Sequence, residues 1–421
     1  MNKITSIKNF DIHSVKEDEF WNFGESKELL MHRIHAYPAK FPSFLIEKAL
    51  NYVKDKGAKP KLIADVFCGC GTSALEAKRL GIDFWGCDIN PVATLIAKVK
   101  SETFDEKIVR NYQTEILGVF EEVSLENNLL KENERINYWF EEETINDLNK
   151  LLFSIKSTVK SKKYQEFFLC AFSNILKASS KWLTKSIKPQ TDPNKKPAKV
   201  MPSFEKQVRL MLKANLEVKN SSITKSKSRV VTTNLLSYKV QKPFADLLIT
   251  SPPYVTSYEY ADLHQLSTLC LGYVDDYRTL RTGTIGSVRN YEIGQSKLKS
   301  LDKFGLSIYQ NLKNVDKSKA RSVAKYFLDL DKATKKIYKM VNDKGYVLFV
   351  IGNTNYKGVE IDNATYLIKR MKACGFKNIE MTKRKISGKN LTPYRDSIGK
   401  FANSNDGRKV YSHEYLIIGR K

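Results

Sequence analysis

Residues 61–88 read KLIADVFCGCGTSALEAKRLGIDFWGCD. The apolar run 61–67 ends at a glycine-rich turn, and a helical pattern follows as far as Gly81, a residue type that commonly ends helices. A second apolar run starts at once and ends at Asp88. Strand, helix and strand in this order make a βαβ unit, which builds a parallel sheet.

The remainder of the chain contains further signals of the same type. A helical pattern over 362–374 ends at Gly375. Strands and helices that alternate along a chain are typical of an α/β fold. Apolar runs predict further strands at 245–250, 345–351, 377–382 and 414–419.

Two segments interrupt this alternation. Residues 105–185 have apolar positions at helical spacing without a strand pattern, and the stretch 181–202 contains four prolines and many lysines, which indicates an exposed basic loop. A second insertion, polar and basic, is predicted at 276–325. We therefore expect an α/β core in two parts, 1–104 and 231–421, separated by a helical and basic insertion at 105–230.

Positive charge is concentrated in parts of the chain. Lys and Arg number 71 against 46 Asp and Glu, a net charge of +25. Residues 151–230 hold 18 basic and 4 acidic residues, and residues 381–421 hold 10 and 3. Such clustering favours a protein that binds a phosphate backbone, although lysines that only solvate the surface are the alternative.

The composition also excludes several classes of protein. No run of about 18 apolar residues predicts a membrane helix, and the charged N-terminus has no apolar core of a secretory signal, so we expect a cytoplasmic protein. The six cysteines form no CxxC unit. We expect Cys68 and Cys70 to be small residues of a tight loop, and we predict no metal site.

The glycine-rich turn predicts a nucleoside-cofactor site. Gly69 and Gly71 allow a tight strand-to-helix turn and a close approach of a ligand to the backbone. Asp88 ends the next strand, 17 residues beyond Gly71, where its carboxylate can accept hydrogen bonds from two ribose hydroxyls.

A second site is predicted where the strand 245–250 meets SPPY, residues 251–254. Two prolines fix an extended backbone and cannot donate to a sheet. This strand should lie beside the first one in the parallel sheet. Ligands bind outside the carboxyl ends of such strands, where both motifs fall.

Together these motifs resemble those of a known family. DVFCGCGT and SPPY are similar to motifs I and IV of the S-adenosylmethionine-dependent DNA amino-methyltransferases, and HAYPAKFP, residues 35–42, resembles motif X. The order X, I, IV matches one of the permuted arrangements of that family. The resemblance implies a Rossmann-like class I methyltransferase sheet with a largely helical insertion, S-adenosyl-L-methionine as the cofactor and double-stranded DNA as the partner.

The resemblance also implies roles for individual residues. Ser251 Oγ and the Pro252 carbonyl would accept hydrogen bonds from the exocyclic amine of a base, which localises the lone pair on its nitrogen. The ring of Tyr254 would stack on a base that has left the duplex. The expected catalytic residues are Ser251, Pro252, Pro253 and Tyr254. The expected cofactor-binding residues are Tyr37, Pro38, Lys40, Asp65, Phe67, Gly69, Gly71, Thr72, Asp88, Ile89 and Asn234, the last in place of an acidic residue that is usual in the family.

Two further groups have expected roles. One or more of the residues after SPPY should line the base pocket, with His264 expected to be a satisfied core or surface histidine. Lysines of the basic loop would contact phosphates and give affinity without sequence information. The expected DNA-contacting residues are Trp182, Lys185, Lys188, Lys195, Lys196 and Lys199. Target recognition would come from 105–185 or 276–325.

The first residue of SPPY favours one target base. In the resembling family SPPY is commoner among cytosine-N4 enzymes and DPPY among adenine-N6 enzymes, so we expect N4-methylcytosine, with adenine-N6 as the alternative. Cytosine C5 methylation is disfavoured because the chain has neither a Pro-Cys dipeptide nor an ENV triplet. We expect a restriction-modification or phage-defence enzyme with a possible cognate endonuclease. An RNA amino-methyltransferase and a non-catalytic DNA-binding protein are the other hypotheses.

Overall fold

Eight strands form the central sheet of the computed structural model, which describes residues 5–6, 12–24, 27–38, 40–124, 130–221, 226–255, 259–287, 298–386, 394–395, 401–402, 408–409 and 413–421. The spatial order is β1-β9-β13-β6-β5-β2-β3-β4. The strands are β1 (Thr5–Ser6), β2 (Leu62–Asp65), β3 (Asp83–Asp88), β4 (Ser228–Thr232), β5 (Ala245–Thr250), β6 (Val341–Ile351), β9 (Lys377–Lys385) and β13 (His413–Arg420).

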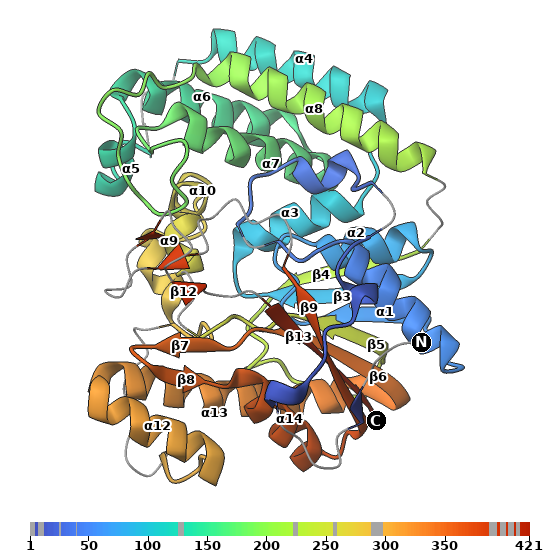
Figure 1. Ribbon diagram of the computed structural model, residues 1–421. Helices are drawn as coiled ribbons and strands as arrows, with labels where there is room; N and C mark the ends of the chain where they lie inside the picture. The colour runs from blue at the N-terminus through green and yellow to red at the C-terminus, as the bar shows by residue number, and fades with distance from the viewer. Residues whose placement is uncertain are drawn as a thin grey trace.

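The sheet is mostly parallel. Strands β4, β3, β2, β5 and β6 pair in parallel, while β13 runs antiparallel to both β6 and β9. Every strand predicted from an apolar run, and the helix predicted at 362–374, is present. This topology confirms the expected Rossmann-like class I methyltransferase sheet (Figure 1).

Alternating side chains of the strands bury both faces of the sheet, as in most parallel sheets. Ile63 and Leu247 pack with α1 (Phe44–Asp55) and α2 (Thr72–Arg79) on one face. Their chain neighbours Ala64 and Leu248 pack with α13 (Lys317–Met340) and α14 (Asn363–Cys374) on the other. The result is a three-layer α/β/α core (Figure 1).

A helical layer lies over the α3 side of this core (Figure 1). Helix α3 (Pro91–Ser101) follows β3, and α7 packs directly against it. The apolar faces of these helices form a core of their own, which includes Trp139, Phe168 and Phe204. The helices of the layer are α4 (Glu106–Glu122), α5 (Glu134–Trp139), α6 (Glu142–Thr158), α7 (Lys162–Ser179) and α8 (Val200–Asn220).

The second insertion differs from its prediction. Residues 276–325 include η4 (Tyr277–Arg281), α12 (Lys303–Val315) and the start of α13. Val323 and Ala324 of α13 are fully buried in the core beneath the sheet, so part of the predicted insertion belongs to the α/β core itself. Lysines are frequent in this 24-residue helix alongside its buried residues, which explains why the segment has a polar and basic composition.

Several shorter elements complete the described chain. Within the described ranges, no helix is long and apolar enough to cross a membrane, and no group of three or more His, Cys, Asp or Glu side chains could hold a metal ion. The shorter elements are η1 (Ile12–Ser14), η2 (Glu19–Trp21), η3 (Leu30–Arg33), α9 (Tyr260–Leu263), α10 (Gln265–Cys270), β7 (Thr354–Tyr356), β8 (Val359–Ile361), β10 (Tyr394–Arg395), β11 (Phe401–Ala402) and β12 (Arg408–Lys409).

Candidate active site

The two predicted motifs lie side by side. β2 and β5 are parallel neighbours, with Ile63 opposite Leu247. The glycine-rich turn after β2 and the SPPY segment after β5 therefore leave the same edge of the sheet (Figure 1). This edge is where α/β folds bind their ligands.

Asp65, the last residue of β2, joins the two motifs. Its carboxylate accepts hydrogen bonds from Thr250 Oγ1 at 2.7 Å and from Ser73 Oγ at 2.6 Å, and from the Phe67 amide at 3.1 Å. Thr250 is the residue before Ser251, and Ser73 lies in the first turn of α2. Asp65 is 3% exposed, so it acts by holding the turn, the helix and the end of β5 together.

Burial dominates the charge state of Asp65. It raises the pKa of the carboxyl to about 6, although the hydrogen bonds from Ser73, Thr250 and Phe67 oppose the rise. The unfolded chain has a pKa of about 3.9 at this group. The folded protein therefore binds more protons than the unfolded chain between these values, and its free energy of unfolding falls as pH rises through them.

We expect Asp65→Asn to remove this pH dependence. The free energy of unfolding of the wild type minus that of the variant should fall by about 2 kcal/mol between pH 4 and pH 7. Denaturant unfolding at several pH values measures the difference. A difference that rises with pH would show that the fold stabilises the ionised carboxylate, contrary to this account.

Gly71 forms the tightest point of the turn. It adopts φ +78°, and a Cβ there would lie 2.5 Å from Ala97 Cα on α3. The backbone of the turn can approach α3 this closely only because no side chain is present. Thr72, 2% exposed, follows as the first residue of α2.

Asp88 closes the other side of the turn. Its carboxylate accepts hydrogen bonds from the Gly69 amide at 3.0 Å and the Asn90 amide at 2.9 Å. Burial raises its pKa. Two donors leave lone pairs on both carboxylate oxygens for further hydrogen bonds. The nearby Asn90 Nδ2 is buried without a hydrogen-bond partner in the described part of the chain.

Tyr37 covers the glycine-rich turn. Its hydroxyl lies 3.4 Å from the position of a Cβ on Gly69, and its ring stacks on His264 with centroids 4.9 Å apart. Burial raises its pKa, and so does the nearby Asp88. Tyr37 of the segment 35–42 therefore lies against the glycine-rich turn. Pro38 beside it is half-buried.

His264 differs from the expectation of a satisfied or exposed side chain. It is 4% exposed, and its Nε2 has no hydrogen-bond partner among the described residues. Burial lowers its pKa to about 3, so the ring is neutral. Because the ring stacks on Tyr37, it places a buried polar atom beside the glycine-rich turn. Of the residues that follow SPPY, 256–258 lie outside the described part of the chain.

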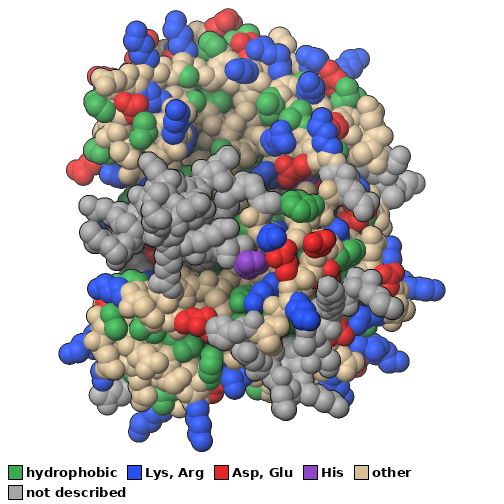
Figure 2. Space-filling view, in the orientation of Figure 1, with side chains coloured by type: hydrophobic (Ala, Val, Ile, Leu, Met, Phe, Trp, Pro, Cys, Tyr) green, Lys and Arg blue, Asp and Glu red, His purple; other side chains and the backbone are tan. Residues whose placement is uncertain are grey.

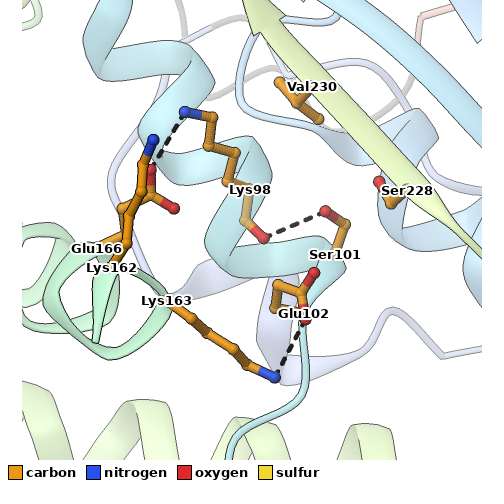
Figure 3. A pocket seen from close by; sticks show the side chains of 8 residues that line it. All are labelled: Lys98, Ser101, Glu102, Lys162, Lys163, Glu166, Ser228 and Val230. Carbon is orange, nitrogen blue, oxygen red and sulfur yellow. Dashed lines mark hydrogen bonds and ion pairs between the residues drawn. The ribbon is translucent and has the colours of Figure 1, made fainter.

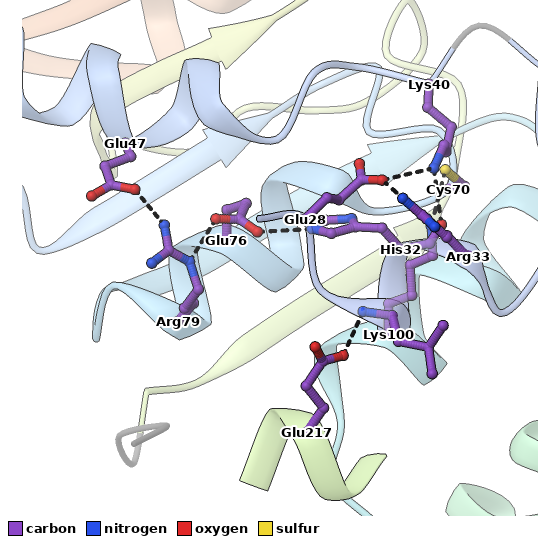
Figure 4. A network of polar contacts seen from close by, with 11 residues as sticks. Glu28, His32, Arg33, Lys40, Glu47, Cys70, Glu76, Arg79, Lys100 and Glu217 are labelled. Atoms are coloured by element: carbon purple, nitrogen blue, oxygen red, sulfur yellow. Dashed lines mark hydrogen bonds and ion pairs between the residues drawn. The ribbon is translucent and has the colours of Figure 1, made fainter. Parts of the chain in front are cut away.

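Lys40 is held by η3 and by the segment before it. Its amine donates to the His32 carbonyl at 3.1 Å and lies 3.7 Å from a Glu28 carboxylate oxygen (Figure 4). These contacts differ from the expected cofactor-binding role. The same region contains a buried network in which His32 contacts Glu76, and Arg79 bridges Glu76 and Glu47 (Figure 4). The network fixes η3 and α1 against α2.

Ile89 and Asn234 converge beside Asp88. Asn234 Nδ2 donates to the Gly283 carbonyl at 3.1 Å, and a Cβ on Gly283 would lie 3.8 Å from Ile89 Cδ1. The Thr233 amide donates to the Asp88 carbonyl at 2.9 Å. Gly283, in the segment after α10, was not predicted. Its φ of +81° marks a close backbone approach, which a glycine in a polar insertion signals only weakly.

Tyr254 is anchored through its hydroxyl. The phenol donates to Glu414 Oε1 at 3.0 Å, and a Cβ on Gly352 would lie 3.3 Å from its Cε2 atom. Ser251 and Pro253 are half-buried and Pro252 is buried. Neither Glu414 nor Gly352 was predicted, since both follow SPPY by about a hundred residues or more.

The basic loop between α7 and α8 contains residues of two kinds. Trp182 is 2% exposed and stacks on Trp139, with centroids 4.9 Å apart. The half-buried Lys195 amine donates to the carbonyls of Lys177 and Trp182, each at 2.7 Å. Both side chains hold the loop together, contrary to their expected contact with DNA. The exposed lysines of the loop are Lys185, Lys188, Lys196 and Lys199.

A cavity of about 240 Å³ lies elsewhere, between α3, the start of α7 and β4 (Figure 3). Lys98 and Lys163 line it, but they are paired with Glu166 and Glu102. On the face shown in Figure 2, Lys and Arg side chains are scattered over the helical layer and the lower body. Neither feature competes with the edge of the sheet as the reaction site.

The residues at this edge fit a nucleoside cofactor. Gly71 lets the turn pack directly against α3, and the Asp88 carboxylate retains lone pairs for ribose hydroxyls. Asn90 Nδ2 and His264 Nε2 are buried polar atoms without partners among the described residues. Phe67 and Ile89 add apolar surface next to them.

Comparisons with known proteins agree with this geometry. A family model described as DNA methylase, of the N6/N4 methyltransferases, matches residues 5–99. The type II methyltransferase M.MvaI of Kocuria varians is 23% identical over 89% of this chain and 88% of its own length. The type II methyltransferase M.BsoBI of Geobacillus stearothermophilus is 26% identical over 81% of this chain and 73% of its own.

The likeness of the chain to solved structures is distant. The rRNA methyltransferase AviRa of Streptomyces viridochromogenes has a TM-score of 0.33 and 7% identity, over 94% of this chain and 90% of that one. So distant a likeness carries no argument about substrate. The family model and the two relatives show that the chain is similar to the DNA amino-methyltransferases of the N6/N4 family, which use S-adenosylmethionine as their cofactor.

Proposed function

We propose that the protein transfers a methyl group from S-adenosylmethionine to the exocyclic N4 amine of cytosine in double-stranded DNA. The observation that carries the proposal is the position of Ser251, a neutral hydroxyl at the end of β5, beside the glycine-rich turn. The Asp65–Thr250 hydrogen bond holds that strand end to the cofactor turn.

The target amine needs help because its lone pair is delocalised into the ring. Hydrogen bonds from its two protons to Ser251 Oγ and to the Pro252 carbonyl draw the nitrogen toward tetrahedral geometry and localise the pair. Pro252 and Pro253 keep these acceptors in place, since proline leaves few alternative backbone conformations. The bound cofactor supplies an electrophilic methyl group on a sulfonium.

The cofactor roles proposed for individual residues follow from their positions. Asp88 would accept from the ribose hydroxyls, and Ile89 and Asn234 would border the adenine. Gly69, Gly71 and Thr72 would bring the backbone of the turn close to the cofactor, with Phe67 and Tyr37 beside it. Asp65 supports this turn from within, and Lys40 is left out of the set because its amine is committed elsewhere.

The ring of Tyr254 would stack on the flipped cytosine. Extruding a base from the duplex costs a few kcal/mol, which stacking partly offsets. Because Glu414 holds the phenol and Gly352 lies against the ring edge, the ring has little freedom to turn away. A ring held in place loses less entropy when the base arrives.

We propose a restriction-modification role with a cognate endonuclease. Support comes from the relatives, which are named type II methyltransferases. In such a system methylation of the recognition sequence would protect host DNA from the endonuclease.

The four exposed lysines of the basic loop should contribute to DNA affinity. Each lysine–phosphate interaction that is removed should reduce the slope of log affinity against log salt by about 0.9. Replacing Lys185, Lys188, Lys196 and Lys199 together with alanine should therefore weaken DNA binding and flatten its salt dependence, with cofactor affinity unchanged. Fluorescence anisotropy over a salt series measures both.

A matched set of exposed lysines serves as the control. Lys313, Lys317 and Lys332 lie on α12 and α13, and Lys344 lies on β6. Their replacement removes the same charge and should alter the salt slope much less. If the two sets of substitutions change DNA affinity and its salt slope equally, the basic loop is not a DNA-contact surface.

Product analysis tests the function itself. Protein is incubated with methyl-labelled S-adenosylmethionine and, separately, with duplex DNA and RNA of mixed sequence; the nucleic acid is then digested to nucleosides and separated. We expect label in N4-methylcytosine from DNA. Label in N6-methyladenine would overturn the choice of base, and label only in RNA would overturn the choice of substrate.

A further inference from the structure

A charged pair stands behind the SPPY motif. Glu414 on β13 and Arg384 on β9 lie directly opposite each other across the antiparallel strand pair. Arg384 donates to Glu414 Oε2 through Nε at 2.9 Å and Nη2 at 2.5 Å, and its side chain is 4% exposed. The other carboxylate oxygen, Oε1, accepts from the Tyr254 hydroxyl at 3.0 Å.

The next group in this chain of contacts is Ser251. Burial raises the pKa of Tyr254 well above its usual range and the Glu414 carboxylate adds to the rise, whereas a hydrogen bond with Ser251 lowers it. The Tyr254 hydroxyl therefore has two hydrogen-bond partners, the Glu414 carboxylate and the Ser251 side chain three residues before it in the chain.

The direction of these hydrogen bonds is set by the charged end. A guanidinium can only donate and remains charged at all relevant pH values, and an ionised carboxylate can only accept. With Glu414 accepting, the phenol must donate to it, and the phenol oxygen is left to accept. The Tyr254 hydroxyl must therefore donate to Glu414, and the Ser251 hydroxyl must donate to Tyr254 Oη.

We propose that Arg384 and Glu414 are positioning residues that orient the Ser251 hydroxyl through Tyr254, so that Ser251 presents only lone pairs to the target base. This inference rests on the proposed role of Ser251 as an acceptor for the amine. A serine hydroxyl alone has one donor and two lone pairs and can serve an amine or a carbonyl equally well. The relay Arg384–Glu414–Tyr254–Ser251 removes that ambiguity.

The relay would select the chemical class of the base. An exocyclic amine donates two hydrogen bonds and matches an oriented acceptor, while a keto oxygen at the same position would face the lone pairs of Ser251. Sites built to hydrogen-bond a substrate group reject an analogue that leaves their buried polar atoms unpaired. The relay thus favours amine-bearing bases over the keto bases produced from them by deamination.

Two variants break the relay without removing the ring or Ser251. Tyr254→Phe deletes the acceptor of the Ser251 proton, and Glu414→Gln removes the charge that sets the direction. Each should lower kcat about 10- to 100-fold, less than the 10²- to 10³-fold loss expected when a preorganised hydrogen-bond partner is removed outright, because Ser251 itself is retained; the dissociation constant of S-adenosylmethionine should be unchanged. Because both act on the same proton, the double variant should be no slower than the slower single variant.

The same sheet contains a matched control. Tyr52 donates to Glu380 on β9, which also pairs with Lys56 at 2.9 Å, so a second Tyr–Glu–cation group lies away from SPPY. Tyr52→Phe and Glu380→Gln should leave kcat and cofactor affinity unchanged. If these changes slow turnover as much as the relay variants do, the effect is a general one of the sheet and the relay is wrong.

Comparing the binding of an amine base with that of its keto analogue shows whether the relay orients the Ser251 hydroxyl or only supports the structure. Once the methylated sequence has been mapped, duplexes are prepared with the target base and with its keto analogue at that position, uracil for cytosine or hypoxanthine for adenine. The wild type should bind the amine duplex at least 10-fold more tightly, and Tyr254→Phe should reduce that ratio several-fold because Ser251 can then donate.

The relay proposal and the choice of cytosine as the target can fail independently of each other. If adenine proves to be methylated, the cytosine proposal fails while the relay is still tested with hypoxanthine. An unchanged ratio in Tyr254→Phe, or additive losses of kcat in the double variant, would overturn the relay whichever base is the substrate.

Discussion

Replacing Ser251 with alanine should lower kcat by about 10²- to 10³-fold, the effect of removing one preorganised hydrogen-bond partner from a transition state. The loss arises because one amine proton would no longer have an acceptor and the nitrogen lone pair would stay delocalised. Single-turnover transfer of labelled methyl to DNA measures it. Affinity for S-adenosylmethionine should be unchanged, since the hydroxyl is directed to Tyr254 and the base.

Ser307→Ala is the matched control. This exposed serine on α12 donates to the Phe304 carbonyl and lies about 50 residues after SPPY in the chain. It should leave kcat unchanged. Normal turnover by Ser251→Ala would refute the role assigned to Ser251, and a parallel loss of cofactor affinity would indicate that the change collapses the turn instead.

Gly71→Ala should have a comparably large effect on cofactor binding. Its Cβ would lie 2.5 Å from Ala97 Cα and 2.6 Å from Ala97 Cβ, in a residue at φ +78°. Strain and overpacking together should reduce the free energy of unfolding by about 2–5 kcal/mol. The displaced turn should also weaken binding of S-adenosylmethionine, measured by calorimetry, by at least about 10-fold, which corresponds to 1.4 kcal/mol.

Gly57→Ala separates steric overlap from the cost of a positive φ. Gly57 adopts φ +82°, almost the same conformation, but nothing lies within 4 Å of its Cβ position. The variant should lose only about 1–2 kcal/mol of stability and retain cofactor affinity. Equal cofactor affinity in the two variants would show that the turn does not approach the cofactor as proposed.

Local patterns were enough to predict most of the sheet. β2, α2 and β3 follow from apolar runs and glycines within 28 residues, and α14 ends at Gly375 in the left-handed conformation that such a glycine favours. β4 was not predicted, because SRVVT is short and only Val230 within it is buried. An edge strand with so little apolar pattern has almost no local signature.

The candidate site was also predicted only in part. Motif residues that lie near one another in the chain were found, and the Asp65–Thr250 contact joins them as parallel strands require. Partners from distant segments were missed: Gly283 beside Asn234, and Glu414 with Arg384 behind Tyr254. The misplacement of Trp182 has another cause, since an aromatic residue in a basic loop can stack on a base or fill a core, and here Trp139 provides the core partner.

The central claim is that this site methylates the N4 amine of cytosine in DNA. The most direct measurement is mass spectrometry of nucleosides from the DNA of a methylation-free host that expresses the wild-type chain, with a host that expresses Ser251→Ala as the reference. We predict N4-methylcytosine in the first DNA and its loss in the second. N6-methyladenine in place of N4-methylcytosine, or equal N4-methylcytosine in both, would contradict the account.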